Sequence, residues 1–330
     1  MKYIFVYPYG WFDSYMYKDL FATGEVVPYM LKEPFHSTLL NFIRKVHCSR
    51  KVNNLVPLPL KDIWNYSLLQ MLENNTCIIF DTGALSMISA SFLYKIKKYR
   101  KNIKMVLFIA DSLHGSSEHI PRAIPNILNF PWDVRLSYDI NDCAEYGFDY
   151  LGPNIYSALR DVEPCAAKSD IYYIGRNKAN RNALILEIYN KCVQNGMRTN
   201  FELIDNKKNL KNSHVENMKG LHFSFVDIPY EKVVSHVLSA NCILEVVAQG
   251  QKAQTARYYE AVCYNKKLLT NNPNIKDLPF YDARYMKVFE RVEDIDFEWV
   301  KKREHINYNY NGQFSPVHAL EKLEKLLNIR

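Results

Sequence analysis

The sequence predicts an α/β protein built from two doubly wound, Rossmann-like domains. Short apolar, β-branched and aromatic runs alternate with helical patterns, and this alternation begins twice along the chain. A length of 330 residues suits two domains of about 150 residues each. Apolar residues make up 48% of the chain and charged residues 23%, as in folded soluble proteins. We therefore expect each half to bury a core of its own.

The first half predicts five strands and three helices, which together form an N-terminal domain over residues 1–153. Each expected strand is a short apolar or aromatic run, and each expected helix has apolar residues every three or four positions. The strands are expected at Lys2–Tyr7, Leu55–Pro57, Cys77–Asp81, Met105–Ala110 and Val134–Tyr138, and the helices at Ile63–Glu73, Ser86–Tyr99 and Asn141–Tyr146.

The less periodic residues 154–168 predict a linker, and residues 169–315 predict a second domain with the same alternation. Strands are expected at 170–174, 199–204, 221–226, 243–247, 267–270 and near 285–289, and helices at 180–194, 230–239 and 253–264. An amphipathic stretch, residues 316–327, predicts a last helix.

Charge and cysteine usage limit the possible partners and the compartment. The chain has 42 Lys and Arg against 35 Asp and Glu, a net charge of +7, which predicts an anionic partner such as a nucleotide, phospholipid or nucleic acid. Its densest basic patches, residues 95–104 and 301–303, are either solvated helix ends or a surface for anionic lipid head groups. The seven cysteines are scattered and form no C-x-x-C pair, which indicates reduced thiols.

The start of the sequence is typical of a core strand rather than a signal peptide, and no apolar run approaches the roughly 20 residues that cross a bilayer. We therefore expect a cytoplasmic protein that can associate peripherally with the cytoplasmic face of the membrane.

The most informative segment, residues 249–270, joins a short polar loop, a helix start and a strand. The strand before it leads to a turn at Gly250. Main-chain amides near Gln254 and Thr255, at the start of the next helix, can face a phosphate. Glu260 lies about one and a half turns further on, where its carboxylate can accept hydrogen bonds from the two hydroxyls of a ribose. This order predicts a nucleotide site.

The same segment resembles the donor-binding motif of GT-B glycosyltransferases, especially bacterial enzymes of lipopolysaccharide, capsule and exopolysaccharide synthesis. That motif reads roughly G-Q-x-x-x-T-x-R-x-x-E-A, and the matching residues are Gly250, Gln251, Thr255, Arg257, Glu260 and Ala261. Residues 134–151 resemble, more loosely, the segment that closes the N-terminal domain of the family. Lys252 and Ala253 depart from the commonest pattern, which leaves the donor-loop geometry open. The alternative is an ordinary helix with a capping Thr255 and a solvent-facing Glu260.

The resemblance implies two domains facing each other across a cleft, with the donor held by the second and the acceptor by the first. It implies transfer of a sugar from a nucleotide sugar, most commonly UDP-linked, to a saccharide or lipid-linked saccharide acceptor in surface-glycan synthesis. No metal and no cofactor are expected, and inversion at the anomeric centre is preferred. Residues 316–330 are expected to pack back at the domain junction.

A second donor-binding candidate is the turn that follows the strand 170–174. It contains Gly175, Arg176, Lys178 and Arg181 beside a helix start. In the resembled fold such a turn faces the diphosphate. Glycine lets the backbone come close, and the cations can offset the charge that builds on the leaving diphosphate. A polar surface turn is the alternative.

Polar residues after the strands of the first half are candidates for a general base. Ligands bind at the carboxyl ends of strands in open α/β sheets. Asp13 follows the first strand in an aromatic, glycine-containing loop and ranks first, and Asp111 and His114 follow a later strand and rank next. Asp81 also ends a strand. Each of them can instead cap a helix or form a turn.

Several competing functions lack their motifs, because the sequence has no Walker loop, G-x-G-x-x-G, H-E-x-x-H or G-x-S-x-G. Asp294 and Asp296 match the D-x-D pattern of metal-dependent GT-A enzymes, but they follow the last strand and we interpret them as surface residues. Two alternatives stay open. One is a non-catalytic two-domain protein that binds a sugar or nucleotide. The other, less favoured, is a nucleic-acid binder, suggested by the net charge and the 24 tyrosines.

Overall fold

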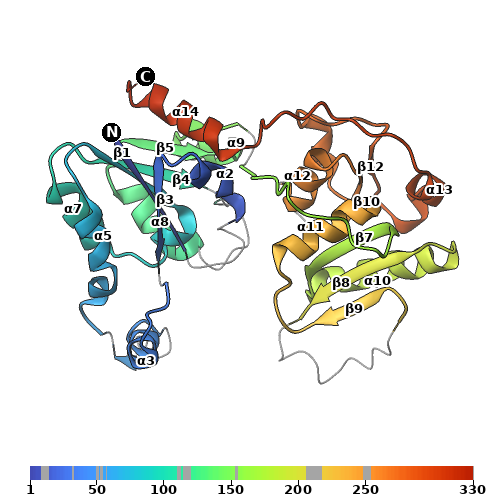
Figure 1. The fold of residues 1–330 in the computed structure, drawn as a ribbon, viewed down its shortest axis with the longest axis horizontal. Helices are drawn as coiled ribbons and strands as arrows, with labels where there is room; N and C mark the ends of the chain where they lie inside the picture. Colours follow the sequence, from blue (N-terminus) through green and yellow to red (C-terminus); the bar gives the residue numbers. More distant parts are fainter. Residues whose placement is uncertain are drawn as a thin grey trace. The chain divides into compact units, whose positions relative to one another are not determined.

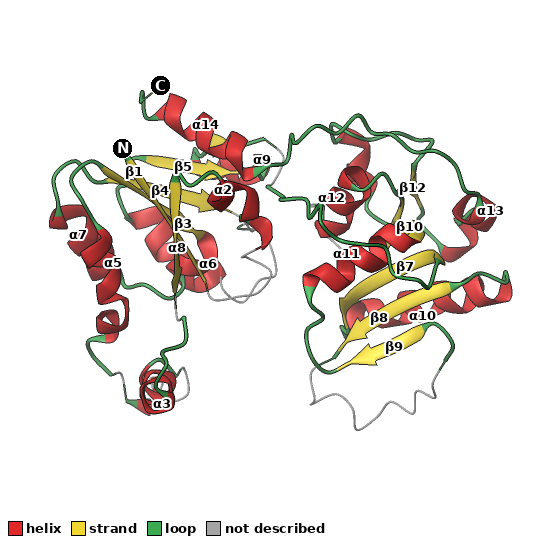
Figure 2. Cartoon of the chain, viewed as in Figure 1, coloured by secondary structure: helices red, strands yellow, loops and turns green. Residues whose placement is uncertain are grey.

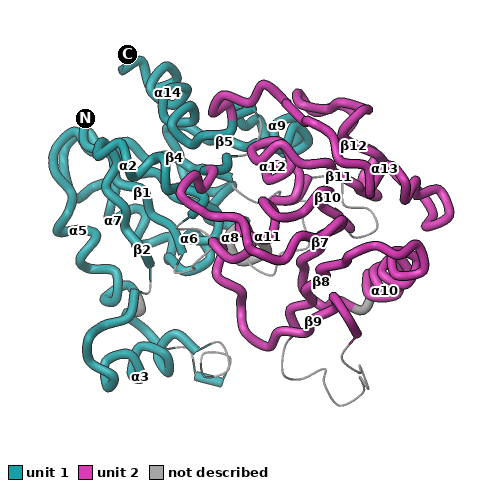
Figure 3. Tube along the Cα trace, turned by 45° about the vertical axis from the view of Figure 1, so that its right-hand side comes forward, with its two compact units in different colours: residues 1–157, 314–330 teal, residues 158–313 magenta. Residues whose placement is uncertain are grey.

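The computed structural model (Figure 1) describes residues 1–8, 15–31, 33–49, 52, 55–56, 58–109, 113, 120–152, 155–205, 218–247 and 254–329. It contains two parallel six-stranded sheets, each packed against helices (Figure 2). The predicted α/β class with two doubly wound domains is confirmed. The chain divides into two compact units (Figure 3): unit 1 comprises residues 1–157 and 314–330, and unit 2 comprises residues 158–313.

The sheet of unit 1 has the strand order β2-β1-β3-β4-β5-β6, with every pair parallel. Its strands are β1 Lys2–Pro8, β2 Val26–Leu31, β3 Thr76–Asp81, β4 Lys104–Ile109, β5 Val134–Ser137 and β6 Asp149–Tyr150. β3 is buried at every position, as expected of a central parallel strand covered on both faces. The order reverses between β1 and β3, so the carboxyl ends of these strands form a topological switch point.

Helices pack on both faces of this sheet, and α3 stands apart from it (Figure 2). The helices of unit 1 are α2 Lys18–Ala22, α3 Thr38–His47, η1 Lys61–Asn65, α5 Tyr66–Met71, α6 Thr82–Leu85, α7 Ala90–Tyr99, α8 Ile120–Asn129, α9 Ile140–Tyr146 and α14 Pro316–Leu326. The last helix, α14, buries Leu320 and Leu323 in the core on the β1 face. The Tyr3 hydroxyl donates to Glu324 Oε1 at 2.8 Å, which fixes α14 to β1 although 321 residues separate the two.

Three sequence predictions in unit 1 were wrong. Residues 55 and 56 lie in no strand, and β2, which pairs with β1, was not predicted from the sequence. A proline, Pro28, interrupts the strand pattern of β2; the fold tolerates it because β2 is an edge strand. The helix predicted at 86–99 begins at Ala90 instead, because Ser89 caps the start of α7. The predicted helix 63–73 is divided into η1 and α5.

Unit 2 has the strand order β12-β11-β10-β7-β8-β9, again all parallel. Its strands are β7 Ser169–Arg176, β8 Thr199–Ile204, β9 Leu221–Ser224, β10 Ala240–Glu245, β11 Lys267–Thr270 and β12 Met286–Val288, close to the six predicted ranges. Its helices are α10 Ala179–Gln194, α11 Tyr230–Ser239, α12 Ala256–Cys263, η3 Pro273–Asp277, η4 Val292–Asp294 and α13 Phe297–Lys301. The switch point of this sheet lies between β7 and β10.

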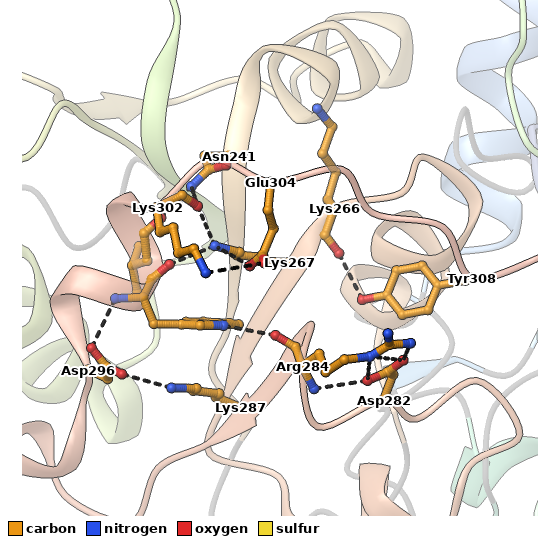
Figure 4. A network of polar contacts seen from close by, with 12 residues as sticks. Asn241, Lys266, Lys267, Asp282, Arg284, Lys287, Asp296, Lys302, Glu304 and Tyr308 are labelled. Carbon is orange, nitrogen blue, oxygen red and sulfur yellow. Dashed lines mark hydrogen bonds and ion pairs between the residues drawn. The ribbon is translucent and has the colours of Figure 1, made fainter.

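A buried lysine, Lys267, joins β11 to α13 in a polar network (Figure 4). Its side chain is completely buried, and Nζ donates to the main-chain carbonyls of Trp299, at 2.7 Å, and Lys302. Nζ also forms an ion pair with Glu304 Oε1 at 2.9 Å. An ammonium group has three donors, and these three partners use all of them. Lys267 thereby satisfies carbonyls that the end of α13 leaves open.

The preceding lysine, Lys266, closes another helix end in the same way. Its Nζ donates to the carbonyls of Leu238 and Ala240, at the end of α11, at 2.7 and 3.0 Å. Both lysines of this pair therefore stabilise the fold of unit 2.

Candidate functional site

A pocket of about 180 Å³ lies at the switch point of unit 2. Its lining comes from the end of β7, the first turn of α10, the residue after β10 and the start of α12. The lining residues are Tyr173, Ile174, Arg181, Val246, Thr255, Ala256 and Arg257. Two helices begin at this pocket, and the amino-terminal end of a helix carries partial positive charge. The pocket is therefore suited to an anionic ligand.

A buried glutamate, Glu245, fixes the start of α12. Its Oε1 accepts hydrogen bonds from the Thr255 amide at 2.9 Å and the Thr255 hydroxyl at 2.6 Å. Its Oε2 accepts one from the Thr270 hydroxyl at 2.7 Å. Burial raises the pKa of Glu245, against the effect of these bonds. The Thr255 amide, expected to face a phosphate, thus donates to Glu245 instead, because β10 ends with an acidic side chain directed at α12.

Thr255 caps α12, as the alternative interpretation of this segment expected, because its hydroxyl accepts a hydrogen bond from the Arg257 amide at 3.2 Å. The preceding residue, Gln254, donates a hydrogen bond from Nε2 to the Tyr259 hydroxyl at 2.7 Å. The first turn of α12 is therefore held rigidly beside the pocket.

Glu260 is completely buried, so the alternative of a solvent-facing Glu260 is wrong. Its Oε1 accepts hydrogen bonds from Arg257 Nη2 at 2.6 Å and from the Tyr230 hydroxyl at 3.0 Å. Burial raises its pKa to about 7, although Arg257 opposes this shift. Its other oxygen, Oε2, is buried without a hydrogen-bond partner among the described residues. Such an oxygen is costly unless a donor reaches it.

Gly175, in the turn after β7, was expected to let the backbone come close to a diphosphate, but the structure shows another reason for a glycine there. A Cβ at Gly175 would come within 2.3 Å of the Tyr173 hydroxyl oxygen. The glycine is therefore needed to accommodate the ring of Tyr173, whatever ligand approaches the backbone.

Of the three cations in this turn, Arg181 lines the pocket. Its Nη1 donates to the Val246 carbonyl at 3.0 Å, which ties α10 to the end of β10, and its buried Nε has no partner within the described parts of the chain. Arg176 is about half exposed and pairs with Asp227 at 2.7 Å. Lys178 is exposed and precedes the first residue of α10.

Sequence reasoning missed Tyr173. Tyr173 lines the pocket, its side chain is buried, and its hydroxyl has no hydrogen-bond partner in the part of the chain that the structure describes. Burial raises the pKa of Tyr173, whereas Arg181 and Arg257 lower it. A tyrosine inside a strand is most often a core residue. The glycine two positions further on was the one signal that could have singled it out.

No family model and no curated protein sequence matches this chain. Solved structures do match it. The chain is similar to an α-glucosyltransferase in complex with UDP and a 13-mer DNA containing a central A:G mismatch, with a TM-score of 0.62, 11% identity and coverage of 99% of this chain and 100% of that one. For the apo form of the lipopolysaccharide outer core galactosyltransferase WaaB, the TM-score is 0.50 and the identity 13%, with 99% of both chains covered.

The chain has the GT-B fold. Both of those similarities extend over both units, and a trehalose-6-phosphate structure from E. coli bound with UDP-2-fluoro glucose also matches 100% of this chain and 95% of its own, with a TM-score of 0.50 and 9% identity. At such low identities the similarity establishes the fold, and function must be argued from the site.

The remaining predicted GT-B site residues lie outside the described residues. These are the candidate bases Asp13, Asp111 and His114 and the donor-loop residues Gly250 and Gln251. Asp81 is described: its Oδ1 accepts a hydrogen bond from the Gly83 amide at 2.6 Å, and Tyr17 donates to Oδ2. Asp81 therefore caps α6, the structural alternative that the sequence left open.

Asp294 and Asp296, the two residues of the D-x-D match, both form ion pairs within unit 2. Asp294 pairs with Arg291 at 3.0 Å, and Asp296 pairs with Lys287 at 2.8 Å and accepts a hydrogen bond from the Trp299 amide at 2.9 Å. Across the residues that the structure describes, no group of three or more His, Cys, Asp or Glu side chains could hold a metal ion. In that same part of the chain, no helix has the length and apolar character needed to span a membrane.

Proposed function

We propose that this protein is a glycosyltransferase that moves a sugar from a nucleotide sugar, UDP-linked, to a saccharide or lipid-linked saccharide acceptor in surface-glycan synthesis. The observation that carries the proposal is the pocket at the switch point of unit 2. There Arg181 and Arg257 lie between two helix starts, and the buried Tyr173 hydroxyl lacks a partner within the described chain. Some solved structures of this fold contain UDP or UDP-2-fluoro glucose.

In this proposal the diphosphate lies in the pocket, where the starts of α10 and α12 and the two arginines offset its charge. The Tyr173 hydroxyl would donate to a phosphate oxygen. Arg176 and Lys178 would add charge at the rim, Arg176 after leaving Asp227. Gly250 and Gln251 stay proposed donor-loop residues.

Glu260 is proposed to bind the ribose. Its Oε2 needs a donor, and a ribose hydroxyl is a donor of suitable size. The hydroxyl would reach it beside Arg257, which already shares the other carboxylate oxygen.

During transfer, the bond between the anomeric carbon and the diphosphate breaks while an acceptor hydroxyl forms the new glycosidic bond. The hydroxyl proton passes to a general base, for which Asp13, Asp111 and His114 remain the candidates. Negative charge builds on the departing diphosphate, and fixed cations and helix starts stabilise that charge without a metal. We propose inversion at the anomeric centre.

The test is a thermal-shift and calorimetric screen of the full chain against UDP, GDP, CMP, dTDP and their sugars. We expect UDP to raise the Tm, and Glu260→Gln to weaken UDP binding at least about tenfold through loss of one charge-assisted hydrogen bond. Glu187→Gln, an exposed glutamate on α10, is the matched control and should bind as the wild type does. Absence of a shift with every nucleotide would contradict the proposal.

Turnover separates the enzyme from a binding protein. We expect slow release of sugar from the stabilising donor, and faster release when an acceptor is present. Tight binding without release or transfer would favour the non-catalytic alternative. Duplex DNA belongs in the acceptor set because the similar α-glucosyltransferase structure holds DNA. Transfer to DNA would overturn the proposed acceptor while leaving the transferase in place.

A further inference from the structure

Helix α3 in unit 1 turns its apolar face to solvent. Leu39, Phe42, Ile43 and Val46 have the spacing that places side chains on one helix face, and they are 65%, 62%, 44% and 39% exposed. No residue of this helix is buried. An amphipathic helix in a globular domain normally directs such a stripe at the core. In α3 the orientation is reversed.

The opposite, polar face attaches α3 to unit 1. Asn41 exchanges two hydrogen bonds with the main chain of Phe35, at 2.8 and 2.7 Å. Arg44 donates to the Glu33 carbonyl at 2.8 Å and lies 4.6 Å from the centre of the Phe35 ring. His47 bonds to the segment that follows the helix. These directional bonds set the rotation of α3 about its own axis, so the exposure of the apolar stripe is specified by the fold.

The chain around α3 is basic as well as apolar. Residues 34–61 contain no Asp or Glu, and their Lys and Arg residues are Arg44, Lys45, Arg50, Lys51 and Lys61. After the helix, Leu55, Val56 and Leu60 are also exposed. Within unit 1, α3 stands apart from the sheet, on the side where β2 ends (Figures 1 and 2).

The basic patches noted in the sequence differ from this segment. Lys97 and Lys104, in the first patch, both pair with Asp133, and Lys302, in the second, pairs with Glu304. Their charge is therefore partly neutralised by neighbouring carboxylates, whereas the sequence around α3 supplies none between residues 34 and 61.

We propose that α3 lies on the surface of an anionic lipid bilayer, with its apolar stripe among the acyl chains nearest the head groups and the neighbouring cations against lipid phosphates. An exposed stripe of Leu, Phe, Ile and Val in a stretch of sequence that has Lys and Arg but no Asp or Glu is the chemistry of a helix in a membrane interface. Nucleic acid would use the cations but leave the aliphatic side chains in water. A second copy of the chain would bring two equally basic segments together.

The proposal goes beyond donor binding and does not depend on it. One consequence rests on the proposed function: if the acceptor is lipid-linked, it would approach unit 1 from the membrane, on the side where β2 ends.

The test is co-sedimentation of the full chain with vesicles of phosphatidylcholine alone or mixed with phosphatidylglycerol. We expect binding to the mixed vesicles that weakens with salt, and little binding to phosphatidylcholine alone. The double variant Leu39→Ser, Phe42→Ser should lower the partition coefficient at least about tenfold, since two large apolar side chains leave the interface. Its Tm should not fall, because neither side chain is buried in unit 1.

Ile140→Ser is the matched control. Ile140 is 66% exposed on α9 of the same unit, so its loss removes a similar apolar area elsewhere and should leave partitioning unchanged. Phe42→Trp should show a blue-shifted emission with mixed vesicles. Absence of binding by the wild type, or an equal loss in Ile140→Ser, would overturn the proposal.

Two other occupants would also be revealed. A wild-type dimer that the double variant disrupts, without vesicle binding, would assign α3 to self-association. Binding to duplex DNA that the double variant abolishes, again without vesicle binding, would assign it to nucleic acid. Either result overturns the membrane proposal. Nucleotide binding by the double variant, measured in parallel, shows whether unit 2 is unaffected, so failure here is distinguishable from failure of the proposed function.

Discussion

Unit 2 has one polar cluster around Lys267 and another at the start of α12. The two clusters differ in how many of their polar atoms have a hydrogen-bond partner. Lys267 places each of its three donors on a carbonyl or carboxylate. The Tyr173 hydroxyl and Arg181 Nε belong to residues that line the pocket, and they have no partner among the described residues. The same is true of Oε2 of Glu260, whose other oxygen bonds to the lining residue Arg257. A saturated cluster has no capacity left for a ligand, whereas an unsaturated cluster beside a cavity has. Unpaired atoms also occur at Tyr172 and Glu202, so the cavity decides the argument rather than the count.

The largest expected effect comes from breaking the saturated cluster. Lys267→Ala leaves the Glu304 carboxylate and two carbonyls of the α13 end without their donor. We expect the unfolding free energy to fall by about 3–5 kcal/mol, the range for removing one partner of a buried pair. Urea denaturation measures it. If Lys267→Ala does not fold, Glu304→Gln should still lose about 1 kcal/mol. Stability within about 0.5 kcal/mol of the wild type in both variants would refute the role of the network.

The pocket cluster should instead show itself through pH. The pKa of Glu260 is raised from 4.5 to about 7 in the folded chain, so between these values the folded protein binds more protons than the unfolded one. Its unfolding free energy should therefore decrease as pH rises through this window, by about 3 kcal/mol in total.

Glu260→Gln cannot titrate and should lack this decrease. The measurement is urea denaturation of both proteins at pH 5 and pH 8, with Glu187→Gln as the control that keeps the wild-type pH dependence. Identical pH dependence in Glu260→Gln and the wild type would show that Glu260 is not buried as described.

A smaller effect should come from the turn that holds Tyr173 at the pocket. Gly175→Ala forces a Cβ toward the Tyr173 hydroxyl, and we expect a loss of about 1–3 kcal/mol, the usual cost of overpacking. Tyr173→Phe removes the nearest atom, so the double variant should lose less than the sum of the two single variants. Strict additivity would mean that the two residues do not meet.

The smallest effect is expected at the rim. Arg176 and Asp227 form an ion pair in which both side chains are exposed to solvent, so Arg176→Ala should change stability by less than about 1 kcal/mol. In the same variant, the loss in the free energy of UDP binding should exceed the loss in the free energy of unfolding, because Arg176 is proposed to leave Asp227 for the ligand. Calorimetry with UDP and urea denaturation compare the two effects, and an unchanged Kd would remove Arg176 from the proposed site.

The sequence predicted the strands correctly where a short run of apolar residues indicates that a strand is buried. The strands of unit 2 are short apolar runs bounded by polar loops, and central parallel strands have this appearance because helices cover both faces. The prediction missed β2, where Pro28 and an edge position weaken the pattern, and α3, whose apolar stripe is exposed to solvent. The helix cap at Thr255 was predictable because a cap is a local arrangement.

By itself, the sequence determined the α/β class, the doubly wound organisation and the position of a charged helix start after β10, since each depends on residues within one or two turns of each other. Only the tertiary structure decided what the charged residues do. Glu245 meets Thr255 and Thr270, and Lys267 meets Trp299, Lys302 and Glu304, across 10 to 37 positions. Whether a charge is paired or left open to a ligand depends on which strand ends the fold brings together, and no local pattern encodes that.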